Sequence, residues 1–256
     1  MNRLLCLLLM LAWSVAAHAV QVQASGAAAH TGPLDLPDGA RLSNAALAAQ
    51  PLPQAYLLGA AWLRPSLTDT QTRLKAGVLF DLDALQRQAR AKGHAELAAT
   101  AGALRHWLGS LPVTGRQVPA LLDPRVVEVT AAANHLLADG DRLFYPQRPT
   151  TIRVVGAVHR PCNLPQVALQ DARLYLAACP RDPATSPDDI YVIEPDGRVF
   201  VQGIALWNRS APLALAPGAI IYVPLRERAV GGVNPGLNHD IATLLATQVL
   251  PGPGAP

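Results

Sequence analysis

The chain has 256 residues, half of them apolar, and its 21 lysines and arginines nearly balance its 18 aspartates and glutamates. A nucleic-acid-binding protein needs a concentrated basic surface to face the phosphates, so this balance argues against nucleic acid as a partner. The length suffices for one large hydrophobic core or two smaller ones, and we expect two modules.

The first nineteen residues have the three parts of a signal peptide. Arg3 is followed by the apolar run LLCLLLMLAW and then by Ala17-His18-Ala19, the small-x-small pattern that signal peptidase cleaves. The sequence therefore predicts a cleaved signal peptide at residues 1–19 and a periplasmic location for the rest. Cys6 lies inside the apolar run, so no lipid anchor is expected. No later stretch approaches the roughly eighteen consecutive apolar residues of a transmembrane helix, so no membrane span is expected.

Two amphipathic helices are expected in the N-terminal half. Residues 20–54 are alanine-rich, and PLDLPDGARL within them indicates a strand and a turn. After Pro65 apolar residues recur at helical spacing up to a stop signal at Gly93, and a second helix ends before Pro112. The apolar positions of the two helices are Leu74, Val78, Leu82 and Leu85, then Leu97, Ala101, Leu104 and Leu108. These patterns predict a helical hairpin inserted at about residues 66–109.

From Leu111 onward the pattern changes to period two with proline punctuation. Short strands are expected at residues 113–121 and 126–130, and a further strand at Thr151–Val155. DARLYLAACP then predicts a short helix, DIYVIEPDGRVFV a hairpin with Asp196-Gly197 as its turn, and AIIYVPL a last strand. Strand, turn, strand, helix, hairpin and strand follow one another in the order of a β-grasp domain.

The C-terminal segment NPGLNHDIATLLATQVL predicts an amphipathic helix at residues 234–250. Asn234 can cap this helix, and Pro235 suits its first turn. Its apolar stripe consists of Leu237, Ile241, Leu244, Leu245 and Val249. The stripe either packs on the chain's own sheet or is offered to a protein partner. A membrane surface is less favoured, because no lysine or arginine follows Arg228.

Cys162 and Cys179 are the two cysteines that remain after the signal segment. In an oxidising compartment they could form a disulfide that closes a modest loop and stabilises the fold by roughly 3 kcal/mol. Spacing alone does not decide whether the two side chains face each other. Metal binding by two cysteines alone is less favoured.

The sequence carries no recognisable catalytic machinery. It has no G-x-S-x-G, no Walker loop and no G-x-G-x-x-G, and its histidines are scattered, so neither a metal nor a cofactor is expected. Asp81-Leu82-Asp83 resembles a metal-binding D-x-D, but it falls within the first expected helix, where a solvated face is the simpler interpretation. Asp188-Asp189 precedes a strand and is interpreted as a turn pair rather than a general acid and base.

Four segments together resemble the GfcC family of periplasmic capsule-biosynthesis proteins. They are LPVTGRQVPALLDPRVVEV, GDRLFYPQRPTTIRVVGAV, ALWNRS with APGAIIYVP, and LNHDIATLLATQVLP, and they follow in order over most of the chain. The second module also resembles the soluble ligand-binding β-grasp units of polysaccharide-export proteins, through VVGAV-x-x-P and PGA-x-I-Y-V-P.

The resemblance implies an α+β fold with two β-grasp domains, a helical-hairpin insertion and a C-terminal amphipathic helix. The expected domains are residues 20–140, which contain the insertion, and residues 141–228. It also implies a protein without catalytic activity that assists assembly or export of a capsular or exopolysaccharide, by binding glycan, an export protein or both.

Arg116, Trp207 and Asn208 are the ligand-binding candidates. Arg116 matches the arginine of the family's T-G-R motif, and its guanidinium could bind a uronate, a phosphate or paired sugar hydroxyls. It could equally pair with Asp123, with Glu128 or with free carbonyl groups. Trp207 and Asn208 could hold a sugar ring by stacking and hydrogen bonding, although a tryptophan buried in the second core is the simpler alternative.

Two other functions remain open. The chain could be a periplasmic enzyme that modifies the polysaccharide, with Asp188, Asp189 or a histidine as the acid-base group. It could also be a structural adaptor whose edge strands pair with another β-grasp protein.

Overall fold

The computed structural model describes residues 19–251, so the predicted signal peptide lies outside the described residues except for Ala19. The strands are β1 (Val20–Gly26), β2 (Gly32–Leu36), β3 (Ala61–Leu63), β4 (Arg142–Tyr145), β5 (Thr151–Gly156), β6 (Cys162–Pro165), β7 (Asp189–Ile193), β8 (Val199–Gly203) and β9 (Ile220–Val223). The helices are α1 (Leu42–Ala49), α2 (Thr68–Ala91), α3 (Ala95–Ser110), α4 (Pro124–Val129), α5 (Ala172–Leu176), α6 (Glu227–Val230) and α7 (Leu237–Ala246), with 3-10 turns at Leu57–Gly59 and Pro65–Leu67. The described chain is therefore an α+β protein.

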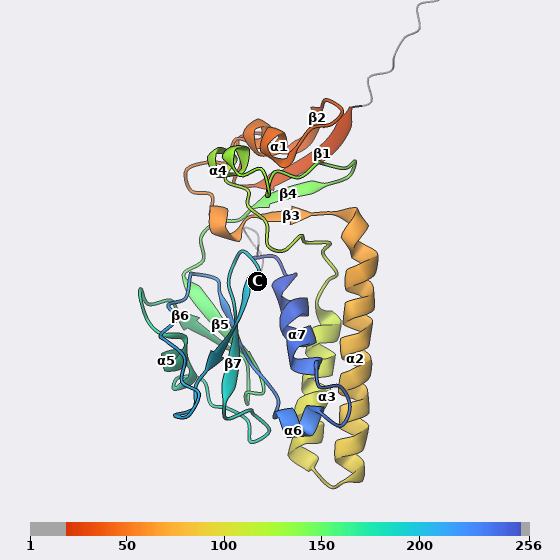
Figure 1. Ribbon diagram of the computed structural model, residues 1–256, viewed down its shortest axis with the longest axis vertical. Coiled ribbons are helices and arrows are strands. Elements are labelled where there is room, and N and C mark those ends of the chain that lie inside the picture. The colour runs from red at the N-terminus through yellow and green to blue at the C-terminus, as the bar shows by residue number, and fades with distance from the viewer. Residues whose placement is uncertain (1–18, 252–256) are drawn as a thin grey trace, which may run out of the picture.

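The first sheet contains four strands in the order β2-β1-β4-β3 (Figure 1). β1 forms an antiparallel hairpin with β2 and pairs in parallel with β4, from Gln23 opposite Arg142 to Gly26 opposite Tyr145. Alternate residues of β1 and β4 point into a core that α1 and α4 complete. One face of this sheet is thus closed by short helices.

The second sheet contains five strands in the order β6-β5-β9-β7-β8. Ile152 and Val154 of β5 belong to the core shared with α5, whereas Val155 belongs to the core shared with α2, α3 and α7. Figure 1 shows α5 on one side of the sheet and α7 on the other, with α2 and α3 beyond α7. Because both faces are covered, the central strands are almost continuously apolar.

The two sheets follow the same chain path. In each, a hairpin leads into a short helix, and the first strand of the hairpin pairs in parallel with the last strand of the sheet's path. Bridges outside the strands repeat as well, because Ala28 pairs with Pro51 and Val158 with Arg181, each partner shifted by 130 positions. The two units are therefore structural repeats.

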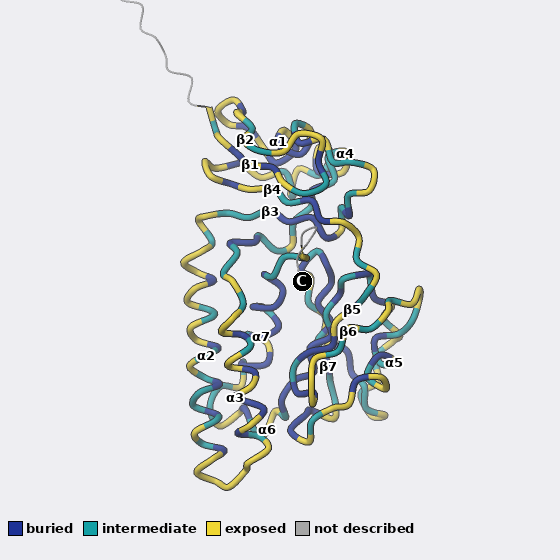
Figure 2. The backbone as a smooth tube through the Cα atoms, turned by 180° about the vertical axis from the view of Figure 1, so that it is seen from behind, coloured by how far each residue is buried: buried dark blue, intermediate teal, exposed yellow. Residues whose placement is uncertain are grey.

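α7 is the central helix of the molecule and is buried along most of its length (Figure 2). Four apolar residues of its stripe are buried against α2, α3 and the second sheet, namely Leu237, Ile241, Leu244 and Leu245. Asn238 of α7 is also buried, and its amide donates to the carbonyl oxygen of Leu225 at 2.8 Å and accepts from the Tyr222 hydroxyl at 3.0 Å. The helix is shorter than the expected 234–250. Its stripe packs within the same molecule and is not offered to a partner.

α4 corrects the expected strand at residues 126–130. Asp123 caps it by accepting a hydrogen bond from the Arg125 N–H at 3.0 Å, and Pro124 occupies the first helical position. These local start signals prevail over the period-two apolar pattern that follows. Residues 113–121, also expected to form a strand, contribute only an isolated bridge between Leu63 and Arg116.

β4 completes the first sheet, although the expected boundary at residue 140 would assign it to the second domain. α2 and α3 are therefore inserted between β3 and β4, which are neighbouring antiparallel strands. Between residues 19 and 251, no helix combines the length and apolarity needed to cross a membrane.

Candidate ligand-binding site

Arg116 is 3% exposed and holds three parts of the chain together. Its Nη1 donates to the carbonyl oxygens of Ala246 at 3.3 Å and Gln248 at 2.7 Å, and its Nη2 donates to that of Pro195. Two of these acceptors lie at the C-terminal end of α7, where unpaired carbonyl groups and the helix dipole favour a cation. Burial lowers the pKa of Arg116 to about 10, against the opposing effect of Asp196.

The two residues before Arg116 also contact distant parts of the chain. Gly115 has a φ of 72°, and a side chain there would come within 2.5 Å of the Arg64 carbonyl oxygen. The hydroxyl of Thr114 donates to the Thr247 carbonyl at 2.7 Å. The close approach that glycine permits is therefore used by the chain's own backbone. Arg116 therefore makes the contacts expected if it pairs with free carbonyl groups of the chain. Binding of a ligand by Arg116 stays a prediction.

Trp207 lies on the surface, so the alternative of a tryptophan buried in the second core does not apply. The residue is 78% exposed and follows β8, and its indole Nε1 donates to Asp188 Oδ1 at 3.1 Å. Asn208 donates to the Asp188 carbonyl oxygen at 3.1 Å and to Asp189 Oδ1 at 3.0 Å. The indole is thus fixed at its N–H edge while most of its surface is open to solvent. An exposed and oriented aromatic face of this kind is suited to stacking on a sugar ring.

A pocket of about 540 Å³ lies beside the loop that carries Trp207. Its lining consists of Asp171, Arg173, Leu174, Leu176, Ala177, Arg181, Pro187, Ile204 and Arg209, and we call it the arginine pocket. Arg173 Nε donates to Asp171 Oδ2 at 2.7 Å, whereas Arg181 and Arg209 form no ion pair within the described residues. Burial alone would raise the pKa of Asp171, but hydrogen bonds from Arg173 and Gln202 outweigh it and lower that pKa. One of the three arginines is therefore neutralised and two are left unpaired.

The arginine pocket could not be predicted from the sequence. Its arginines come from α5, from the loop after α5 and from the loop after β8, and no sequence spacing connects them. The available signal was Arg209, which directly follows Trp207-Asn208.

Cys162 of β6 and Cys179, which follows α5, are joined by a disulfide with an S–S distance of 2.05 Å. β6 is an edge strand of the second sheet, and Cys179 is buried in the core between that sheet and α5. The bridge therefore fastens the end of α5, a helix that lines the arginine pocket, to the edge strand β6, and neither sulfur is free to bind a metal.

The remaining carboxylate candidates are occupied by contacts with other side chains of the protein. Asp81 accepts a hydrogen bond from Asn234 at 2.7 Å, and Asp83 pairs with Arg87 and, at 3.7 Å, with Arg105. Among the described residues, no group of three or more histidine, cysteine, aspartate or glutamate side chains is arranged to hold a metal ion. The D-x-D segment thus lies on a polar helix face.

Asp188 and Asp189 act together as anchors for the Trp207 loop. Burial raises the pKa of Asp189, as do Asp188 and Glu227, and the hydrogen bond from Asn208 opposes them. The two carboxylates are adjacent in sequence and hold neighbouring side chains, which gives them a positioning role in this loop.

The fold and these sites define an α+β protein made of two repeated sheet units, with an exposed tryptophan beside a basic pocket. The family model described as capsule biosynthesis GfcC, N-terminal, matches residues 16–148, and the model described as capsule biosynthesis GfcC C-terminal matches residues 160–250. The chain belongs to the GfcC family of capsule-biosynthesis proteins.

The chain is also similar to the uncharacterized protein YjbG of Escherichia coli (strain K12). The two are 31% identical over 159 residues, which cover 62% of this chain and 64% of that protein. The similarity thus spans less than two thirds of the relative's length.

Proposed function

We propose that this protein is a non-catalytic periplasmic component of capsular or exopolysaccharide assembly or export, and that it binds the glycan directly. The observation that carries the proposal is the exposed Trp207, fixed by Asp188 beside the arginine pocket, in a chain of the capsule-biosynthesis family. The signal-peptide pattern of residues 1–19 supports the location. The shared chain path of the two sheets, with first and last strands parallel, supports two β-grasp units.

Each group has a distinct role in this proposal. The face of Trp207 stacks on the apolar face of a sugar ring, while Arg181 and Arg209 bind carboxylate or hydroxyl groups of the same or the next sugar. The amide nitrogen of Asn208 donates hydrogen bonds to Asp188 and Asp189, so Asn208 positions the loop and does not need to contact the glycan.

Calorimetric titration of the purified protein with fragments of the host's own surface polysaccharide tests the proposal. We expect saturable binding that Trp207→Ala weakens by roughly tenfold or more, because the stacking surface is lost. Phe80→Ala is the matched control, since it removes another exposed aromatic ring, 68% exposed, from α2. Equal affinity of Trp207→Ala and the native protein would rule out this site.

An enzymatic role would give a different result in the same titration. Release of shorter or chemically altered glycan, abolished by Asp188→Asn or Asp189→Asn, would replace binding by catalysis as the function.

A docking role has one supporting observation of its own. β8 is one of the two outer strands of the second sheet, and its Val201 is 58% exposed. An outer strand can pair with a strand of another protein. Absence of any glycan binding, together with capture of a polysaccharide-export protein that Val201→Asp abolishes, would favour this second function.

A further inference from the structure

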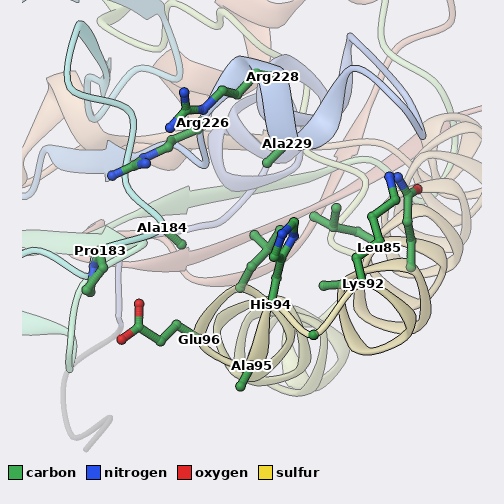
Figure 3. A pocket seen from close by; sticks show the side chains of 14 residues that line it. Leu85, Lys92, His94, Ala95, Glu96, Pro183, Ala184, Arg226, Arg228 and Ala229 are labelled. Carbon is green, nitrogen blue, oxygen red and sulfur yellow. The ribbon is translucent and has the colours of Figure 1, made fainter.

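A second basic pocket lies between the turn that joins α2 to α3 and the loops of the second sheet. Its volume is about 700 Å³. Lys92, His94 and Glu96 line it from the turn, and Arg226 and Arg228 line it from the segment around α6. Figure 3 shows His94 reaching from the turn into the pocket, with both arginines on the opposite side. We call it the turn pocket.

The turn pocket gathers positive charge that the protein itself does not neutralise. Lys92, His94 and Arg228 are exposed, and their side chains form no hydrogen bond or ion pair within residues 19–251. Arg226 commits its Nε to the Thr185 carbonyl at 3.2 Å and makes no ion pair with a described residue. Glu96 is the one carboxylate in the lining. Lys92, Arg226 and Arg228 outnumber this single carboxylate, so they repel one another, and a bound anion would relieve that repulsion.

Two further features of the turn pocket suit a ligand that has an apolar part and an anionic group. Leu85, Ala89 and Ala184 give the pocket an apolar part. The first residues of α3 also line it, and no side chain caps that helix, so the N–H groups of its first turn lack capping partners. The volume is within the range of roughly 300–1,000 Å³ that is usual for small-ligand pockets.

We propose that the turn pocket binds the anionic group, a carboxylate or a phosphate, of an acidic saccharide unit. The loop 181–187 separates it from the arginine pocket, since Pro183 and Ala184 line the first and Arg181 and Pro187 the second. A glycan held at Trp207 thus has an anion-binding pocket on the other side of one short loop. The saccharide part of this inference rests on the proposed function, whereas the anion part stands on the pocket alone.

Calorimetric titrations with three probes separate the chemistry. Trigalacturonate supplies carboxylates, glucose 1-phosphate supplies a phosphate, and maltotriose is the uncharged comparison. We expect saturable binding of at least one charged probe, weakened about ten- to a hundredfold by Lys92→Ala/Arg228→Ala, because two charge-assisted contacts are lost. The charge reversal Arg228→Glu changes the net charge by the same two units as the double variant and should also weaken binding. Preference for trigalacturonate identifies a carboxylate ligand, and preference for glucose 1-phosphate identifies a phosphate ligand.

Arg90→Ala/Arg125→Ala is the control, because it removes the same charge from two exposed positions outside the described pockets. It should leave affinity unchanged, and so should Trp207→Ala for glucose 1-phosphate, which is too short to reach both sites. Hydrogen exchange should slow in the turn around His94 when the probe binds. Equal weakening by the control pair, equal affinity for maltotriose, or no saturable binding of either charged probe would overturn the inference. Loss of binding in Trp207→Ala alone would overturn it too, and would support the proposed function instead.

Discussion

Glu194, at the end of β7, is a buried carboxylate close to the junction that Arg116 holds. Burial raises its pKa to about 7. The Ala216 N–H, 3.3 Å from Oε2, and Arg198 oppose this shift, whereas Asp196 adds to it. The folded protein therefore holds a proton at this site under conditions in which the unfolded chain releases it.

The sign of the effect on stability follows from that difference. Glutamate in the unfolded chain titrates near 4.5, so the protonated side chain contributes stability that is fully present below that pH and is lost as the pH rises through about 7. Glu194→Gln should therefore unfold with a higher free energy than the native protein at about pH 8, and with a flatter pH dependence from about pH 5 to pH 8. Urea unfolding across this range measures both. Asp38→Asn, at an exposed turn, is the control and should keep the native slope.

At the residue scale, the sequence singles out candidates but does not assign their contacts. Arg116 is conspicuous as a charge in an apolar run, yet its acceptors belong to Pro195, Ala246 and Gln248, far away in the chain. Trp207 is exposed because it lies beyond the edge strand β8, a position that depends on sheet order. Contacts between distant segments decide both cases, and no local pattern encodes them.

At the element scale, helices could be predicted where apolar residues recur at helical spacing over many residues. The extended apolar stripes of α2 and α3 indicate helices at once. The hairpin of β7 and β8 was also predicted correctly, but its turn is centred on Pro195 and Asp196, with Gly197 following at a φ of 86°, and is not the expected two-residue turn at Asp196-Gly197. The prediction was wrong at α4, where six residues carry too little periodicity and the capping signals of Asp123 and Pro124 decide the structure. α1 was missed because its eight residues are too few for a helical period to repeat clearly.

The link between β6 and α5 depends on the disulfide. The bridged cysteines are 17 positions apart, so Cys162→Ser/Cys179→Ser should lower the free energy of unfolding by about 3 kcal/mol. Thermal unfolding with and without a reductant measures the effect. The reductant should lower the midpoint of the native protein and leave that of the double variant unchanged. A native midpoint that does not respond to reduction would contradict a stabilising bridge.

At the scale of the whole molecule, α7 joins the second sheet to α2 and α3 and also supplies acceptors for Arg116. Two modules and their order could be predicted from the sequence. The boundary between them could not, because β4 precedes β5 so closely that the two look like parts of one segment. Only the pairing of β4 with β1, a contact between distant residues, assigns it to the first sheet.

Removal of residues 234–256 should prevent cooperative folding of the rest of the chain, because α7 fills the core between the second sheet and the long helices. A point variant gives a graded version: Ile241→Ala, at a fully buried position, should cost roughly 2–5 kcal/mol. Val249→Ala, at a half-buried position after α7, should cost less. Denaturant unfolding followed by circular dichroism measures all three. A cooperative transition in the truncated protein would show that α7 is dispensable for the core.

From the insertion of α2 and α3 we also expect a particular order of folding events. Gln23 and Arg142 pair although they are 119 positions apart in the sequence. β1 can therefore pair with β4 only after a long loop has closed. The contacts between α2 and α3 are local and can form early, and they bring the chain at the end of α3 back towards the start of α2, which follows β3. The loop that remains to be closed before β4 pairs is then shorter. Until β4 pairs, β1 has only β2 beside it, and its other edge is open to strands of other molecules. Weakening of the α2–α3 pair would therefore be expected to appear first as aggregation through the N-terminal sheet.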